Sequence, residues 1–473
     1  MPIQFISLGL ALISTGQDAQ LFNDSERAAV VSYWSAPGRY AKADVKNPKG
    51  PWVVRSTPEG SRWLWNYNKA RGLSKTNPLT DPGALSSDQV DWEKWIDAKV
   101  AYDRYQAAVK VGELNAQAFN VSPDAPAMDS VDDPGPMPQA LNDLVGDAPP
   151  FAAPIKPTTY TISFDDGTTI QYKDAVEMRP RYAYYRATQG VQSAGAKLKI
   201  QSDEVARLCE MAGLSDTERH VMAAVSPLEG GFDSVNTYDT GYVSVGFIQF
   251  ACLEGGAGSL GAVLKTEKNA RPDAFASDFR RYGIDVTDGG RLDCVDPATG
   301  NEVVGSDAAK AIIEDKRLTA VFQRAGQKSD AFRVAQLQTA RTMYYPSEDL
   351  VPISTPEGTV KCKVCDLVHS EAGMAILMDR KVNTGNLNPM SSIVAGVWQD
   401  AGAQSVEELA AHELEIVQAL ILRKDFLSDP NLSQPTGARR AASKNSRHGD
   451  RKPRPKPKPK GDDGSSGGID DGK

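Results

Sequence analysis

The sequence predicts an α+β protein that is mainly α, with small β-hairpins inside a helical domain and a separate Trp-rich N-terminal domain before it. Three observations support this prediction. Several segments after residue 195 repeat apolar side chains at the spacing of amphipathic helices. Alternating runs around Asp-Asp-Gly at 165–167 and Tyr-Asp-Thr-Gly at 238–241 are typical of hairpins. Six of the seven tryptophans lie within the first 118 residues.

Composition divides the 473 residues into four parts. Residues 1–118 form the Trp-rich domain, of unknown role, with a helix predicted over 91–115. Residues 119–158 read as a Pro-rich linker, since nine prolines fall between 121 and 158. Residues 159–435 form the helical domain, and residues 436–473 form a disordered tail that is basic and Pro/Lys-rich, then rich in Gly, Ser and Asp.

Charge and hydropathy exclude several classes of protein. The net charge is −8, although the stretch 439–460 holds ten Lys and Arg and one acid, so the body is more acidic than the whole. An acidic body argues against a nucleic-acid-binding core. No run of 18 apolar residues exists, so no membrane span is expected.

The first residues contain a short apolar stretch without the basic flank of a signal peptide. The first basic residue is Arg27. We therefore interpret the stretch as a buried strand or helix and expect no clear signal peptide.

The helical domain is marked by capping signals. Ser215 and Glu218 form a capping box before an apolar stripe, and Pro227 ends that helix. Further helices are predicted over 272–283, 329–345, 370–385 and 405–426. Glu229 is therefore expected just past a helix C-terminus.

This position of Glu229 suits a general acid. Cleavage of a glycosidic bond needs a carboxylic acid beside the leaving oxygen and a second carboxylate near the sugar. The negative end of a helix and the apolar neighbours Leu228 and Phe232 disfavour an ionised carboxylate. The glycines at 230 and 231 would let a sugar chain approach the backbone.

The second carboxylate follows in a predicted ribbon. A strand to Tyr238, a turn at residues 239–241 and a returning strand with Ser244 would place Asp239 beside the same cleft as Glu229. Taken alone, an Asp in such a turn usually bonds its own backbone. The ordered combination of these residues favours glycan cleavage.

This stretch of about 25 residues resembles the active-site region of the lysozyme superfamily. In phage-type muramidases a Glu ends a helix, an Asp follows in a β-hairpin, and a Thr precedes an aliphatic-Gly-aliphatic run. Here Glu229, Asp239 and Ser244-Val-Gly-Phe stand in that order, with Ser in place of Thr and one residue more between Glu and Asp. Glu229-Gly-Gly-Phe and Gly246-Phe-Ile-Gln are also similar to motifs of soluble lytic transglycosylases, with Gly230 in place of Ser.

The resemblance implies a lysozyme-like fold and a peptidoglycan-cleaving muramidase that needs no cofactor and no metal. Glu229 would be the general acid, Asp239 the stabilising or water-orienting carboxylate, and Ser244 would hold the water or Asp239. Substrate contacts would come from Phe232, Tyr238, Gln249 and Asn383, the last in "AILMDRKVNTG", which is similar to a helix of phage endolysins.

Several alternatives stay open at this point. The enzyme alternatives are a lytic transglycosylase, in which the sugar's own hydroxyl replaces water, and a chitin- or chitosan-cleaving enzyme. The different class is a non-catalytic structural or wall-binding component of a phage tail or contractile injection system. Cys362 and Cys365 give a further alternative, half of a zinc site. Nucleotide-binding, zinc-protease and serine-hydrolase motifs are absent from the sequence.

These inferences set the expected partners and location. Peptidoglycan or a related glycan is the expected substrate, and phage or secretion-machine proteins are candidate partners. We expect action at the bacterial cell wall, with delivery by a phage particle, a holin or a secretion machine. The basic tail is either a tether to an anionic wall or a solvated extension.

Overall fold

The computed structural model describes residues 20–72, 86–123, 126, 128–177, 179–196 and 202–436. About 48% of the structure is helix and 15% is strand, which confirms an α+β protein that is mainly α. The apolar N-terminal stretch and the basic tail from residue 437 lie outside the described residues.

The first part of the chain forms helices and hairpins. The predicted helix over 91–115 is confirmed and is longer, because a capping box at Ser86 starts it and Asn120 in the left-handed region ends it. The predicted Asp-Asp-Gly hairpin is confirmed, with Ser163 paired to Thr169. The elements are α1 (Asp24–Ser35), β1 (Tyr40–Asp44), β2 (Val53–Ser56), α2 (Pro58–Ala70), α3 (Ser87–Phe119), α4 (Gln139–Val145), β3 (Ala152–Ile155), β4 (Thr158–Ser163) and β5 (Thr169–Lys173).

The N-terminal residues do not form one separate domain. Trp34 of α1 is buried and donates from Nε1 to the carbonyl of Tyr282, 3.0 Å away. Glu26 pairs with Arg280 at 2.8 Å. Strand β1 pairs with β4 in the order β1-β4-β5. Apolar burial thus joins α1 to the main core, whereas α2 and α3 share a second, smaller core.

The predicted linker over 119–158 also differs from expectation, since it contains α4 and β3. Leu141 is fully buried and Phe151 is 4% exposed, both in the second core. The buried carboxylate of Asp103 in α3 accepts a hydrogen bond from the Phe151 amide at 2.8 Å. The prolines therefore separate short packed elements rather than mark an unstructured connection.

The central body is built from helices around small sheets. The helices predicted over 272–283 and 329–345 are present, the first as α8 followed by a 3₁₀ turn. Its elements are β6 (Gln192–Ser193), α5 (Asp203–Met211), α6 (Asp216–Val225), η1 (Ser226–Leu228), β7 (Val235–Asn236), β8 (Ser244–Val245), β9 (Phe250–Ala251), α7 (Ser259–Ala270), α8 (Pro272–Asp278), η2 (Arg280–Tyr282), β10 (Ile284–Val286), β11 (Leu292–Val295), β12 (Glu302–Val304), α9 (Ser306–Glu314), α10 (Lys316–Lys328) and α11 (Asp330–Tyr344).

A C-terminal lobe of helices and one hairpin follows. The helix predicted over 370–385 is confirmed and ends at Gly385 in the left-handed region. The elements are β13 (Leu350–Thr355), β14 (Gly358–Lys363), η3 (Val364–Asp366), α12 (Glu371–Thr384), α13 (Met390–Ala401), α14 (Val406–Ala410), α15 (Glu413–Gln418) and η4 (Phe426–Ser428).

The single helix predicted over 405–426 is wrong. Ser405 caps its start as expected, accepting from the Glu408 amide. The helix is then interrupted at Ala411 and His412, and the segment forms three separate short elements, α14, α15 and η4. Buried Leu409, Leu420 and Phe426 require the chain to bend around the lobe's core, which overrides helix propensity.

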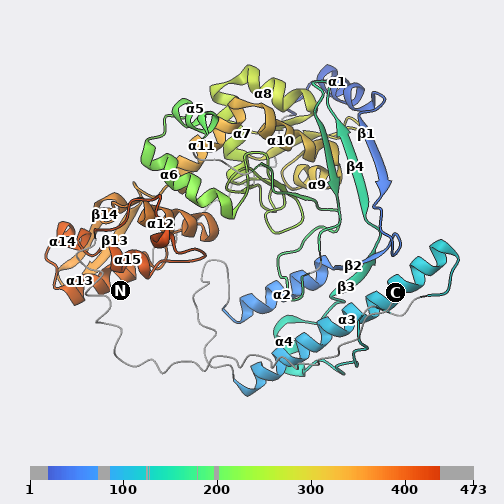
Figure 1. Cartoon of the computed structure of the whole chain (residues 1–473), viewed down its shortest axis with the longest axis horizontal. Coiled ribbons are helices and arrows are strands. Elements are labelled where there is room, and N and C mark those ends of the chain that lie inside the picture. The colour runs from blue at the N-terminus through green and yellow to red at the C-terminus, as the bar shows by residue number, and fades with distance from the viewer. Residues whose placement is uncertain are drawn as a thin grey trace, which may run out of the picture.

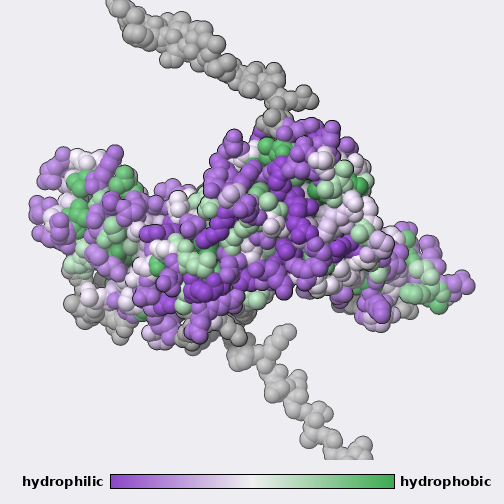
Figure 2. Space-filling model, turned by 90° about the horizontal axis from the view of Figure 1, so that it is seen from above, coloured by the Kyte–Doolittle hydropathy of each residue, from purple (hydrophilic) through white to green (hydrophobic). Residues whose placement is uncertain are grey.

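The C-terminal lobe lies beside α6 and the central helices, while α2, α3 and α4 project from another side of the central body (Figure 1). Helix α12 packs against α6, and His220 contacts Glu371 at 2.9 Å. The face seen in Figure 2 is mostly hydrophilic, with scattered apolar patches. Within the described ranges, no helix has the length and hydropathy needed to cross a membrane.

Candidate functional site

Glu229 lies just past a helix end, as the sequence predicts. Helix α6 ends at Val225 and continues as the 3₁₀ turn η1, in which Pro227 stands. Glu229 caps this turn, and its amide donates to the Ser226 carbonyl at 2.9 Å. Its side chain is 14% exposed, so a mostly desolvated carboxylate reaches the surface here.

The two glycines after Glu229 serve the fold rather than a sugar chain. The Gly231 amide donates to the Ala194 carbonyl at 3.0 Å. A Cβ on Gly231 would stand 1.9 Å from the Ala196 carbonyl oxygen, and one on Gly230 would stand 2.6 Å from the Ser234 side chain. The glycines let the chain around residues 194–196 pack on the Glu229 loop, which corrects the sequence-based interpretation.

Arg423 of the C-terminal lobe forms an ion pair with Glu229. Its Nη2 lies 2.7 Å from Glu229 Oε1. The same guanidinium donates from Nε to Asp379 Oδ1 at 2.8 Å, and its Nη2 also contacts that oxygen. Asp379 in α12 is 1% exposed. The pair therefore joins the Glu229 loop of the central body to α12 of the lobe.

Asn383 belongs to this cluster but contacts Asp379, not an open groove. Its Nδ2 donates to the Asp379 carbonyl at 2.7 Å and to Oδ1 at 3.3 Å. Asn383 lies on the helix predicted over 370–385, and its contact with substrate stays a prediction. The sequence does not indicate Arg423 as a site residue, because Arg423 lies near the end of the segment predicted as one helix over 405–426.

The cluster holds two carboxylates around one guanidinium. Burial lowers the pKa of Arg423, but the hydrogen bond to Asp379 and the charge of Glu229 outweigh it, so the net shift is upward. Arg423 is therefore a permanent cation. With both acids ionised, the cluster has one more negative charge than positive charge.

The charge of Glu229 acts on Tyr344, the last residue of α11, which the sequence does not predict at the site. Burial raises the pKa of Tyr344, the hydrogen bond with Ser259 opposes this, and the charge of Glu229 adds to it. Its ring centroid is 6.2 Å from that of Phe250 in β9. The Tyr344 ring thus packs on the small sheet. No motif marks a tyrosine at a helix end, so the sequence offered no signal for it.

Asp239 and Ser244 lie at the turn between β7 and β8, in the sheet ordered β6-β7-β8-β9. Asp239 Oδ1 accepts from the Gly241 amide at 2.8 Å, and Oδ2 accepts from Asn236 Nδ2 at 2.7 Å. A Cβ on Gly241 would stand 2.2 Å from Ser244 Oγ and 3.1 Å from Asp239 Oδ1. The two predicted residues therefore meet at Gly241.

Buried Gln336 of α11 ties the turn between β8 and β9 to the loop that follows Glu229. Its Nε2 donates to the Phe232 carbonyl at 3.0 Å, and its Oε1 accepts from the Phe247 amide at 3.3 Å. Gly246, at φ +85°, allows this approach, because a Cβ there would stand 2.2 Å from Gln336 Oε1. One side chain thus fixes the spacing of the two loops.

Three predicted substrate contacts support the site from within. Gln249 donates from Nε2 to Ser234 Oγ at 2.6 Å and to the Gly246 carbonyl at 3.2 Å. Tyr238 is 3% exposed, and Phe232 is 6% exposed with its ring 5.4 Å from that of Phe247. Gln249 bonds to the protein itself, and the two aromatic rings are buried, which corrects their predicted placement along an open groove.

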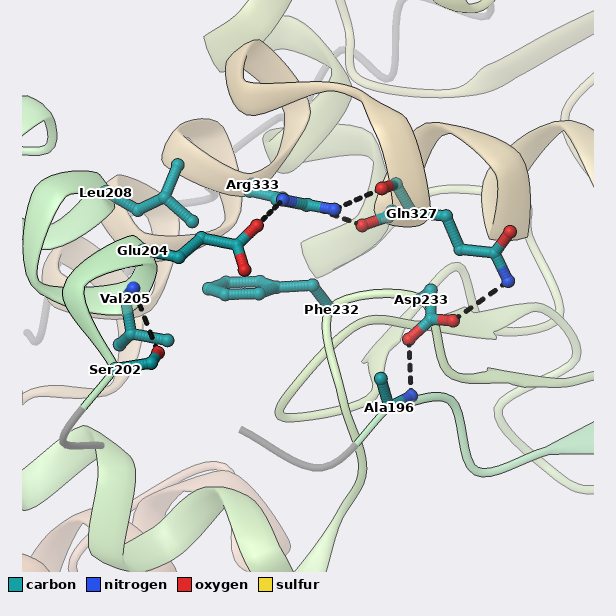
Figure 3. A pocket seen from close by; sticks show the side chains of 10 residues that line it. Ala196, Ser202, Glu204, Val205, Leu208, Phe232, Asp233, Gln327 and Arg333 are labelled. Carbon is teal, nitrogen blue, oxygen red and sulfur yellow. Dashed lines mark hydrogen bonds and ion pairs between the residues drawn. The ribbon is translucent and has the colours of Figure 1, made fainter. Parts of the chain in front are cut away.

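Phe232 also borders a cavity of about 460 Å³ between α5 and the α10–α11 turn (Figure 3). Glu204 and Arg333 pair at 2.6 Å across it. Gln327 donates to Asp233 at 3.1 Å, and Asp233 accepts from the Ala196 amide at 2.7 Å. These polar groups bind one another, so we assign no ligand to this cavity.

The cysteine pair does not assemble a larger cluster. Cys362 is buried in β14 with its sulfur 3.9 Å from the Val351 carbonyl, and Cys365 lies in η3. In the parts of the chain that the structure describes, no group of three or more His, Cys, Asp or Glu side chains could hold a metal. The zinc alternative therefore lacks further ligands there.

No protein-family model, curated protein or solved structure matches the chain. The likeness to the lysozyme superfamily accordingly rests on the short sequence motif alone. Its implications for fold and activity stay predictions.

Proposed function

We propose that the protein is a peptidoglycan-cleaving muramidase. The observation that carries this proposal is the placement of Glu229, a mostly desolvated carboxylate at a helix end that pairs with Arg423, in a loop that Gln336 ties to the sheet with Asp239. Glycosidic cleavage uses a pair of carboxyl groups with different surroundings. Glu229 and Asp239 differ in this way.

Glu229 is the general acid in this proposal. An ion pair with a guanidinium favours a carboxylate, yet a general acid must carry a proton. Both requirements can be met because Arg423 is shared between Glu229 and Asp379. Asp379 takes two donors from Arg423 and one from Asn383 on a single oxygen, so Arg423 is anchored mainly on Asp379. The Glu229 side chain is 14% exposed whereas Asp379 is 1% exposed, so Glu229 is the carboxyl that can meet a substrate and give it a proton.

Asp239 is the assisting carboxylate, and its hydrogen bonds bear on the choice of nucleophile. Gly241 and Asn236 hold both of its oxygens, so the carboxylate is fixed in place. A carboxylate that is already occupied stabilises a cationic sugar by charge but orients water less well. This observation favours the lytic transglycosylase as the second candidate.

The proposed setting is the bacterial cell wall, reached by a phage particle, a holin or a secretion machine. Chitin or chitosan would use the same two carboxylates. A non-catalytic wall-binding component of a phage tail or injection system would keep the Glu229–Arg423 pair for stability alone. These options differ in products, which makes the test direct.

The test is incubation of the full-length protein with purified peptidoglycan, followed by mass analysis of the soluble fragments. Muropeptides with reducing ends would support hydrolysis, and anhydro ends would support transglycosylation. Release from chitosan but not from peptidoglycan would transfer the activity to that substrate. Intact polymers of all kinds would favour the non-catalytic component.

A further inference from the structure

Helix α2 of the N-terminal part contacts the segment that supports Asp239. Ser61 Oγ donates to the Tyr182 carbonyl at 2.6 Å and accepts from the Tyr185 amide at 2.8 Å. Arg186 Nη1 lies 3.4 Å from the same hydroxyl. Ser61 is 3% exposed. One buried hydroxyl thus docks α2 on residues 182–186.

The same segment is bonded to the turn that carries Asp239. The Arg186 amide donates to the Tyr238 carbonyl at 2.7 Å, and Tyr185 forms an antiparallel bridge with Asp239. The position of α2 relative to Asp239 is therefore set by backbone hydrogen bonds. Surface side chains of α2 stand at a fixed distance from the proposed site.

Two arginines belong to this junction, and Arg186 Nη1 also donates to the Ala183 carbonyl at 2.9 Å and to the Tyr185 carbonyl at 2.7 Å. Arg62 is exposed on α2 and, within the described ranges, makes no hydrogen bond or ion pair. Burial and then the charge of Arg62 lower the pKa of Arg186. Burial and then Glu254 raise the pKa of Tyr242, while the charges of Arg62 and Arg186 oppose this. Arg62 directly follows Ser61, whose hydroxyl lies 3.4 Å from the Arg186 guanidinium. Two guanidinium groups on adjoining segments suit an anionic ligand.

Aromatic rings continue from this junction. Trp65 of α2 and Tyr184 meet edge to face with centroids 5.4 Å apart, and Tyr182 follows at 5.5 Å from Tyr184. All three are half-buried, so parts of their rings reach the surface. Partly exposed aromatic faces suit the apolar faces of sugar rings.

We propose that α2 adds a glycan-binding surface beside Asp239, with Arg62 and Arg186 binding a carboxylate of the glycan strand and Trp65 and Tyr184 contacting its sugar rings. The inference rests on the proposed function and gives the N-terminal part a role in it. Peptidoglycan carries such carboxylates on its stem peptides, and on lactyl groups that have lost their peptide, whereas chitin carries none. Arg62 would then select the acidic polymer.

The test measures binding, not cleavage, in the full chain with Glu229→Gln as background. Co-sedimentation is measured with purified peptidoglycan, with the same peptidoglycan after amidation of its carboxyl groups, and with chitin. Arg62→Gln is compared with Lys69→Gln, which removes an exposed positive charge from the last turn of the same helix. Arg62→Lys and Trp65→Ala complete the set.

We expect Arg62→Gln to weaken binding to native peptidoglycan by about three- to tenfold at low salt, with no change on amidated peptidoglycan or chitin. Arg62→Lys should restore part of the loss, and Lys69→Gln should bind as the background does. Trp65→Ala should weaken binding to all three polymers. Equal losses for Arg62→Gln and Lys69→Gln, or an unchanged Arg62→Gln, would overturn the inference. Uncleaved walls with wild-type protein would instead count against the proposed function alone.

Discussion

Replacing Arg423 with glutamine would remove the ion pairs that join the Glu229 loop to α12 at the candidate site. The change leaves Asp379, at 1% exposed, without the guanidinium that gives it two donors. It also leaves Glu229 without its 2.7 Å partner. Asn383 remains as a donor to Asp379. The variant therefore tests both the stability and the chemistry of the cluster.

The size of the effect follows from burial. Removing one partner of a buried ion pair costs about 3–5 kcal/mol, because the other charge stays buried. The Arg423 side chain is 31% exposed, so water offsets part of this cost. We expect Arg423→Gln to lower the free energy of unfolding by about 2–3 kcal/mol. The double variant Arg423→Gln/Asp379→Asn removes both charges and should lose only about 1 kcal/mol.

The assay combines urea unfolding with release of muropeptides from purified walls. Both variants should cleave at least about tenfold more slowly, because Glu229 loses its fixed position. Lys424→Gln is the matched control, since Lys424 is the adjacent cation and lies 3.8 Å from Asp429. Arg423→Gln with the stability and cleavage rate of wild type would refute the reasoning. So would a double variant that regains full activity.

Three further predictions concern Asp239, Glu267 and the tail. Asp239→Asn should slow hydrolysis strongly and transglycosylation mildly, and a wild-type rate with reducing-end products would make Asp239 a turn residue only. Burial, with Asp278 adding to it, raises the pKa of Glu267 to about 9, while an unfolded glutamate ionises near pH ~4.3. Between these two pH values the folded protein keeps a proton on Glu267 that the unfolded chain has lost, so the folded state loses stability as pH rises through this range. The melting temperature of wild type should therefore fall from pH 5 to pH 9, and that of Glu267→Gln should fall less. A pH response unchanged by the substitution would contradict this assignment. Deleting residues 437–473 should weaken wall binding at low salt and change little at 1 M salt, whereas equal pull-down of both proteins at low salt would reject a tether.

Local signals predicted much of the secondary structure. The Ser215–Glu218 capping box, the Asp-Asp-Gly hairpin and the long helix α3 depend on contacts within a few residues, which the sequence states directly. The predicted helix over 405–426 failed because its apolar residues follow the curvature of the lobe's core rather than one helical face. The proline content of 119–158 predicts a linker, but α4 and β3 form there because Leu141 and Phe151 are buried in the second core.

The candidate site was predictable where it lies within one stretch of the chain. Glu229, Asp239 and Ser244 follow in order within 16 residues, and Asp239 and Ser244 do meet at Gly241, whereas their grouping with Glu229 stays a prediction. Arg423 and Gln336 come from distant segments, and only tertiary packing brings them to the Glu229 loop. The docking of α2 through Ser61 is of the same kind, because a single serine carries no motif.

The measurement that tests the central claim most directly is peptidoglycan cleavage by full-length wild type and by Glu229→Gln. Circular dichroism and thermal unfolding would first establish that the substitution leaves the protein folded. Wild type should release muropeptides, and Glu229→Gln should do so at least about 100-fold more slowly, because loss of a general acid removes that contribution. A folded Glu229→Gln that cleaves walls within threefold of a clearly active wild type would contradict the assignment of Glu229.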